Sequence, residues 1–224
     1  MSAVLSLADV PAGFARPAQS SQSVFRSVLD VMSRPGRVMG LDVQVLAGMV
    51  APLALRGRVG RAMAAVWLTL LDAETTLWLG GELATPQAAA FCRFHTGVRL
   101  VVDPAEAAFV ALRHEALTPT LWGQLNAGSD ECPQAGATLI VEVATLAAPA
   151  AQEADGVAAA THSLRLAGPG IERDHQLTVG GPARTLWERR IAQQAFLLLG
   201  ADLILCCGDR LAAIPRSTRV TLQD

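Results

Sequence analysis

The sequence predicts an α/β fold with a mixed β-sheet, in one domain that spans residues 1–224. First, short apolar and β-branched runs alternate loosely with helical patterns along the chain. Second, some of these runs follow one another without an intervening helix, which argues against a strictly parallel, doubly wound sheet. Third, 224 residues suffice for one large core, and no internal repeat is visible.

The N-terminal part is expected to begin with an amphipathic helix. Ser20 or Ser21 is the expected N-cap, and apolar residues recur at helical spacing from Val24 to Met32. The Pro35-Gly36 pair should end this helix. Residues 37–46 are expected to form a strand pair or hairpin.

Arg61–Leu71 is apolar on nearly every side, so the pattern fits a buried strand and a buried helix equally well. Ala147–Thr161 has no periodicity and is expected to be a surface loop. Further strands are expected at 75–79, 98–102, 109–112, 137–146, 163–167, 177–179 and 203–207, with Leu211–Val220 ending the fold, and further helices at 86–94, 104–108, 118–125 and 182–196.

Composition limits the possible environments and partners. A hydrophobic content of 51% with 17% charged residues exceeds what a soluble monomer needs, so we expect a homodimer when the chain is isolated. No run approaches the roughly 20 apolar residues of a membrane span, and no basic segment precedes the N-terminal apolar residues, so a cytoplasmic protein is expected. A net charge of −2 gives no electrostatic reason to bind nucleic acid.

The chain contains no lysine, because all 18 cationic residues are arginines. A pyridoxal phosphate enzyme needs a lysine amine and a P-loop needs its lysine, so neither chemistry is expected. Cys206 and Cys207 are adjacent, so a strand would place them on opposite faces. Cys92 and His95 form a lone C-x-x-H without a second ligand pair, so we expect neither a metal nor a cofactor.

One predicted helix end carries a cation, an imidazole, a hydroxyl and a flexible backbone, from Arg93, His95, Thr96 and Gly97. These groups could bind a phosphate, with His95 as a proton donor near neutral pH. The alternative is an ordinary helix C-terminus, with basic residues favoured by the dipole and Gly97 in the left-handed conformation.

Two further pairs are candidates for a cleft or a partner surface. Asp72 and Glu74 lie on the same side of an extended segment and could divide into an acid and a base. A solvated turn explains them equally well. Gln22 and Arg26 could face a partner, although a helix start with an apolar face also accounts for them.

Near the C-terminus, strand alternation places Arg216 and Thr218 on one face, which makes them the better pair for holding an anion. Apolar residues bracket this segment, and an arginine buried there needs a counter-charge. We expect an internal carboxylate, with Asp202 or Asp209 nearest in sequence. An external anion is the alternative.

A set of motifs in fixed order carries a family resemblance across roughly residues 13–222. The motifs are Ser21–Arg26, Met32–Gly36, Leu68–Asp72 leading into Leu77–Leu79, Arg93–Gly97, Gly136–Ile140, Leu166–Ile171, Leu199–Leu205 and Ala213–Val220. In this order and spacing the chain resembles the PhnH family, whose members are subunits of the bacterial carbon–phosphorus lyase core complex, which degrades phosphonates.

The resemblance implies a three-layer sandwich similar to the large domain of pyridoxal-phosphate-dependent transferases, without the cofactor lysine. It also implies a complex with G, I and J subunits that supports formation of alpha-D-ribose 1-methylphosphonate 5-triphosphate from ATP and phosphonate, releasing adenine. Three roles remain open: a scaffolding subunit, a contributor of nucleotide- or phosphonate-binding Arg or His residues to a shared site, or an autonomous enzyme.

Overall fold

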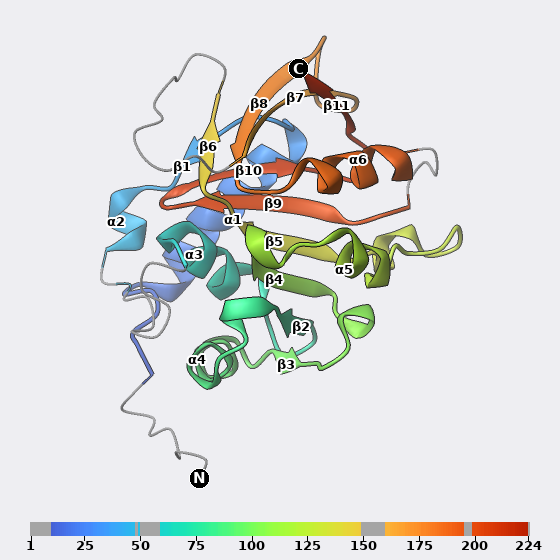
Figure 1. Cartoon of the computed structure of the whole chain (residues 1–224). Helices are drawn as coiled ribbons and strands as arrows, with labels where there is room; N and C mark the ends of the chain where they lie inside the picture. Colours follow the sequence, from blue (N-terminus) through green and yellow to red (C-terminus); the bar gives the residue numbers. More distant parts are fainter. Residues whose placement is uncertain (1–9, 48, 50–58, 149–159, 195–198, 224) are drawn as a thin grey trace.

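A seven-stranded mixed sheet organises the computed structural model, which describes residues 10–47, 49, 59–148, 160–194 and 199–223 (Figure 1). The strand order is β1-β10-β9-β5-β4-β2-β3. Its members are β1 (Met39–Gly40), β2 (Thr76–Leu79), β3 (Arg99–Leu100), β4 (Phe109–Arg113), β5 (Thr138–Glu142), β9 (Asp202–Cys207) and β10 (Arg210–Ile214). The strands from β9 to β3 run parallel, whereas β10 and β1 add antiparallel. The predicted α/β class with a mixed sheet is confirmed.

A second sheet is antiparallel, with the order β11-β7-β8-β6. Its strands are β6 (Thr145–Ala147), β7 (Thr161–Ala167), β8 (His175–Gly180) and β11 (Arg219–Gln223). The α-helices are α1 (Pro17–Ser33), α2 (Val43–Leu46), α3 (Arg61–Leu70), α4 (Pro86–Thr96), α5 (Pro119–Gln124) and α6 (Arg184–Gln193). Short 3₁₀ turns lie at Gly81–Leu83, Pro104–Glu106, His114–Ala116 and Pro133–Ala135.

Two apolar cores lie on the two faces of the large sheet. Ala111 and Ile140 face the core that includes α1, α3 and α4. Their sequence neighbours Val110 and Leu139 face the core built with α5, α6 and the second sheet. This alternation explains why β4 and β5 are continuously apolar, because a strand buried on both faces has no solvent side. Cys206 and Cys207 follow the same rule and lie on opposite faces, as predicted.

The segment whose pattern fitted both a strand and a helix is the helix α3. Its residues from Ala62 to Trp67 are all buried, because α3 packs between α1, α4 and the strands β5 and β9. A helix covered on all sides has no polar face, and therefore no amphipathic pattern.

Three expectations near element ends are wrong. The first helix begins at Pro17 rather than at Ser20 or Ser21, because Pro fits the first helical turn and Ser20 already donates its N–H to the Arg16 carbonyl. Residues 37–46 do not form a hairpin: Met39–Gly40 pairs with β10, and Asp42 caps the single turn of α2. The run at 137–146 is divided between β5 and β6, which belong to different sheets.

Other boundaries agree with the sequence. Thr85 and Thr118 cap α4 and α5 through their hydroxyls, each followed by Pro at the first helical turn. Strands β7 and β8 flank the Gly-Pro-Gly turn as expected. Most of the loop expected at about 147–161, together with the end of the helix expected to reach Phe196, lies outside the described residues.

Candidate functional site

The residues at the end of α4 make the contacts of a helix C-terminus. Gly97 is left-handed (φ 73°) and donates its N–H to the Arg93 carbonyl. His95 Nε2 lies 2.8 Å from the Pro11 carbonyl oxygen, and Thr96 donates its hydroxyl to the Cys92 carbonyl. Arg93 is exposed. His95 therefore ties the N-terminal segment to α4, and Thr96 bonds within its own helix.

The paired carboxylates Asp72 and Glu74 are both exposed. Asp72 Oδ1 accepts the backbone N–H groups of Glu74 and Thr75, each at 3.0 Å. This is an Asx-type turn that leads into β2. Gln22 and Arg26 are exposed on α1, far from this turn in the sequence.

The C-terminal motif forms an internal ion pair, as expected for an arginine bracketed by apolar strand positions. Arg216 Nη2 lies 2.6 Å from Asp202 Oδ2, and the backbone N–H of Arg216 donates to Asp202 Oδ1 at 2.7 Å. Both side chains are largely buried. Asp202 is the predicted partner, whereas Asp209, the other carboxylate considered, pairs with Arg61.

A second buried arginine also binds this turn. Arg190 of α6 is 3% exposed, and its Nη2 donates to the carbonyls of Pro215, Arg216 and Thr218 at 3.0–3.2 Å. Burial lowers the pKa of Arg190 to about 10. Thr218 is buried in this turn. The hydrogen bonds between Arg190 and this turn therefore connect α6 to the segment between β10 and β11.

The structure brings two of the sequence candidates together, because the turn that carries Asp72 and Glu74 lies beside the end of α4, where Ala73 is the nearest neighbour of Gly97. The candidates as a whole do not converge on one site. Helix α4, which carries Arg93, His95 and Thr96, and strand β11, which follows Thr218, lie at opposite ends of the molecule (Figure 1).

The structure instead brings charged residues together at the carboxyl ends of β4 and β5. Arg113 and Glu142 end these parallel strands and are neighbours in register. They line a cavity of about 340 Å³ with Gly60, Cys207 and Gly208. Ligands of α/β sheets commonly bind at the carboxyl ends of parallel strands, which makes this cavity the best candidate for a functional site.

Glu142 is the acidic residue that lines this cavity. The residue is 8% exposed, and Oε1 accepts the N–H of Gly208 at 3.3 Å. Burial raises the pKa of Glu142 to about 7, although the N–H groups of Gly60 and Gly208 and the charge of Arg113 favour the ionised form. Oε2 is buried and makes no hydrogen bond within the described part of the chain. This carboxyl can therefore hold or release a proton near neutral pH.

The neighbouring charges are paired. Arg113 binds Glu115 through two hydrogen bonds of 2.7 and 3.1 Å. His114 Nε2 lies 3.2 Å from Glu115, and burial lowers the pKa of His114. None of the sequence patterns singled out this group. The sequence does show a change from apolar to charged residues at the end of each strand, at Arg113-His114-Glu115 and at Glu142. Only the parallel register shows that these two charged strand ends lie side by side.

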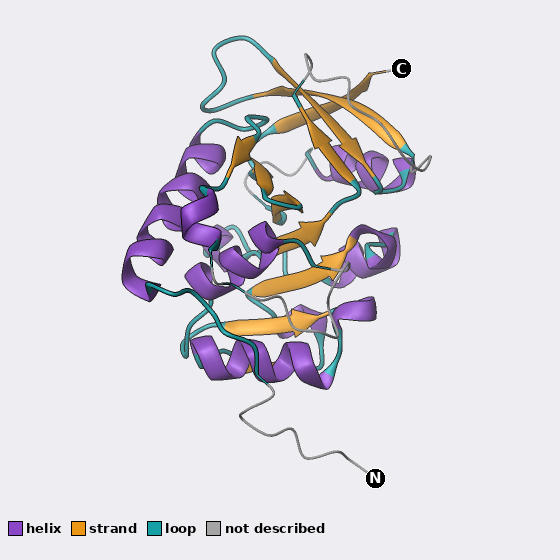
Figure 2. Cartoon of the chain, turned by 90° about the vertical axis from the view of Figure 1, so that its left-hand side faces the viewer, coloured by secondary structure: helices purple, strands orange, loops and turns teal. Residues whose placement is uncertain are grey.

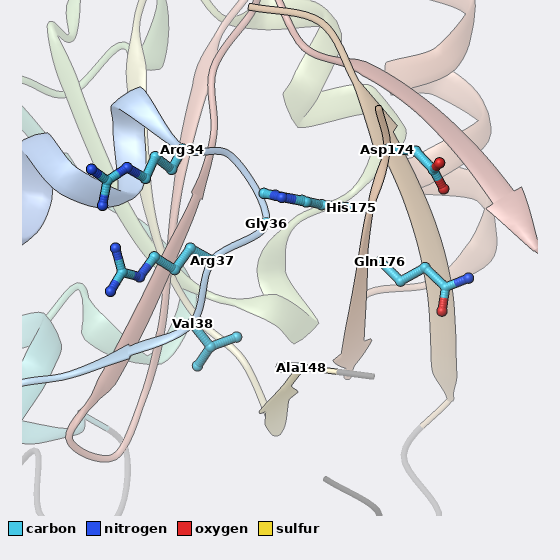
Figure 3. A pocket seen from close by; sticks show the side chains of 8 residues that line it. All are labelled: Arg34, Gly36, Arg37, Val38, Ala148, Asp174, His175 and Gln176. Atoms are coloured by element: carbon cyan, nitrogen blue, oxygen red, sulfur yellow. The ribbon is translucent and has the colours of Figure 1, made fainter. Parts of the chain in front are cut away.

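Another cavity, of about 540 Å³, lies between the loop after α1 and the start of β8. In Figure 3 the side chains of Arg34 and Arg37 point to the same side, away from His175. His175 Nδ1 lies 2.9 Å from the Pro35 carbonyl oxygen, and Asp174 points away on the other side. Because these polar groups diverge, the cavity does not assemble a binding constellation.

Within the described ranges, no three His, Cys, Asp or Glu side chains are placed to hold a metal ion. None of the helices in those same ranges is long and apolar enough to cross a membrane.

Comparison with known proteins gives a consistent result. Residues 12–221 match the family described as "Bacterial phosphonate metabolism protein (PhnH)". The chain is 31% identical, over 92% of its length and 93% of the relative's, to "Alpha-D-ribose 1-methylphosphonate 5-triphosphate synthase subunit PhnH" of Rhizobium meliloti (strain 1021). It is 32% identical, over 92% of its length and 88% of the relative's, to "Putative C-P lyase subunit protein HtxG" of Stutzerimonas stutzeri.

Proposed function

Because the chain belongs to the PhnH family of bacterial phosphonate metabolism proteins, we propose that it is a subunit of a carbon–phosphorus lyase complex in phosphonate catabolism. In this role it supports formation of alpha-D-ribose 1-methylphosphonate 5-triphosphate from ATP and phosphonate, with release of adenine. Its partners are the G, I and J subunits, and the isolated chain forms a homodimer. The single-domain fold is similar to the large domain of pyridoxal-phosphate-dependent transferases, without the cofactor.

We propose further that the subunit is mainly a scaffold. The observation that supports this role is that Arg216, for which an external anion was the alternative partner, is neutralised by Asp202 inside the chain. The contacts of His95 and Thr96 with backbone carbonyls point the same way. A scaffold needs rigid internal pairing of this kind and does not need a free cation.

A second candidate function is a contribution to a shared binding site. The cavity at Arg113 and Glu142 favours this alternative, because a carboxyl that titrates near neutral pH beside an arginine is typical of functional sites.

The test is reconstitution with the G, I and J subunits, followed by measurement of adenine release from ATP and methylphosphonate. Omitting this chain should abolish both assembly and adenine release. Glu142→Gln should assemble normally and, if the chain is a scaffold, should release adenine at the wild-type rate. A tenfold or greater loss of rate in a fully assembled Glu142→Gln complex would instead support the shared site. Failure of the wild-type chain to assemble with these subunits would refute the proposed function.

A further inference from the structure

The first turn of helix α1 has neither an acidic residue nor a side-chain cap. In Figure 2, α1 runs along one outer edge of the molecule, and the loop from the N-terminus enters it at its lower end. The N-cap residue, Arg16, makes no side-chain hydrogen bond to the helix. The backbone N–H groups of Ala18 and Gln19 have no partner among the residues that the structure describes. This end of a 17-residue helix therefore has an uncompensated partial positive charge.

A cavity of about 300 Å³ lies at this end of α1. Its described lining comes from the start of α1 and from α2 with the residue after it, and consists of Ala15, Arg16, Ser20, Gln44 and Ala47. Its volume is about ten times the roughly 30 Å³ that one water molecule occupies in the liquid, so a phosphate-sized ion can enter. Arg16 has no ion pair with any described residue, and this described lining includes no acidic side chain. The cavity is therefore electropositive.

Ser20 is the residue that points to a ligand. It is 7% exposed, and its hydroxyl makes no hydrogen bond within the described part of the chain. Its Oγ keeps accessible surface, and because Ser20 lines the cavity, the hydroxyl can donate to a molecule there. A buried hydroxyl without a partner costs free energy, and its strongest acceptors are charged oxygens. An anion in the cavity would satisfy this hydroxyl beside both the helix end and the guanidinium of Arg16.

We propose that this cavity binds a phosphate- or phosphonate-type oxyanion. Ser20 donates its hydroxyl to one oxygen of the anion, Arg16 supplies the compensating charge, and the N-terminal end of α1 stabilises the negative charge. The oxyanion has two possible sources, a free phosphate or phosphonate ion and the terminal phosphate of a nucleotide. The site shares no described lining residue with the cavity at Arg113 and Glu142. The inference goes beyond the proposed function and does not depend on assembly with other subunits.

The experiment measures binding to the isolated full-length chain by isothermal titration calorimetry, with inorganic phosphate, methylphosphonate and ATP as probes. At least one of the three should bind saturably. Ser20→Ala should weaken this binding about tenfold, as expected for the loss of a hydrogen bond to a charged group. Arg16→Gln should weaken it by a smaller factor that shrinks as salt is added, because the arginine is exposed.

The melting temperature separates a ligand-binding role of Ser20 from a structural one. Without an added anion, Ser20→Ala should melt no lower than the wild type, because the hydroxyl has no hydrogen bond to lose within the described part of the chain. With a saturating probe, the wild type should gain melting temperature and the variant should gain less.

Ser21→Ala and Arg26→Gln are matched controls, because both residues lie on α1 outside the described lining of the cavity. They should leave the dissociation constant unchanged. Tighter binding of phosphate or methylphosphonate than of ATP would identify a free ion as the source, and the reverse order would identify a nucleotide. Absence of saturable binding for all three probes, or binding that Ser20→Ala retains in full, would overturn the proposal. Neither result bears on assembly with the G, I and J subunits, so failure here is distinct from failure of the proposed function.

Discussion

Replacing Glu142 with Gln should stabilise the protein at alkaline pH, although the carboxyl accepts hydrogen bonds in the native structure. Gln keeps an oxygen that can accept the N–H of Gly208, and it removes the charge that burial disfavours. The substitution therefore separates the cost of burying the charge from the benefit of the hydrogen bond.

The magnitude follows from linkage. The pKa of Glu142 is about 7 in the folded protein, against a reference value of 4.5. At 1.36 kcal/mol per pKa unit, ionising the buried carboxyl costs about 3 kcal/mol of folding stability. Because the folded pKa is raised, the stability associated with this group is present below about pH 4.5. It is lost as pH rises through about 7.

The assay is urea unfolding of both proteins at pH 4.5 and pH 8, with the free energy of unfolding of Glu142→Gln compared with that of the wild type. The two should be nearly equal at pH 4.5, and the variant should be more stable by about 3 kcal/mol at pH 8. Groups that titrate identically in both proteins cancel in the difference. A variant less stable than the wild type at pH 8, or a difference that does not change with pH, would refute the reasoning.

Three further predictions concern structural contacts. Arg216→Ala leaves Asp202 buried without its guanidinium partner, so it should lower stability by about 3 kcal/mol and the melting temperature by roughly 10 °C in calorimetry; an unchanged melting temperature would contradict the internal pairing. Gly97→Ala places a side chain at φ 73° and should cost about 1 kcal/mol in denaturant unfolding, whereas no cost would argue against the left-handed cap. Burial raises the pKa of Cys206 well above its usual value, so a thiol reagent at pH 8 should label exposed Cys132 quickly and Cys206 only after unfolding; fast labelling of both in the folded protein would show that the core is open.

Elements with local signals could be predicted from the sequence. Thr85 and Thr118 each precede a proline, and that combination of cap and first-turn residue indicates a helix start without tertiary information. The continuously apolar β5 is recognisable for a similar reason, because burial on both faces leaves no polar positions. The first turn of α1 was missed because its N-cap, Arg16, makes no side-chain cap.

The candidate site depends on contacts that are distant in sequence. Arg113 and Glu142 meet only because β4 and β5 pair in parallel with these residues in register. No sequence motif around either residue indicates a functional site. Arg216 is the exception, because its apolar neighbours required a counter-charge and few carboxylates were near enough in sequence to provide one.

The two margins of the large sheet have a consequence for the behaviour of a chain that is 51% hydrophobic. Both outermost strands, β1 and β3, have only two residues. So short a strand offers too few unpaired backbone groups to template a strand from another molecule, which is how many natural sheets avoid amyloid-like stacking. At high concentration, the free chain should therefore resist growth into fibrils from either edge of this sheet.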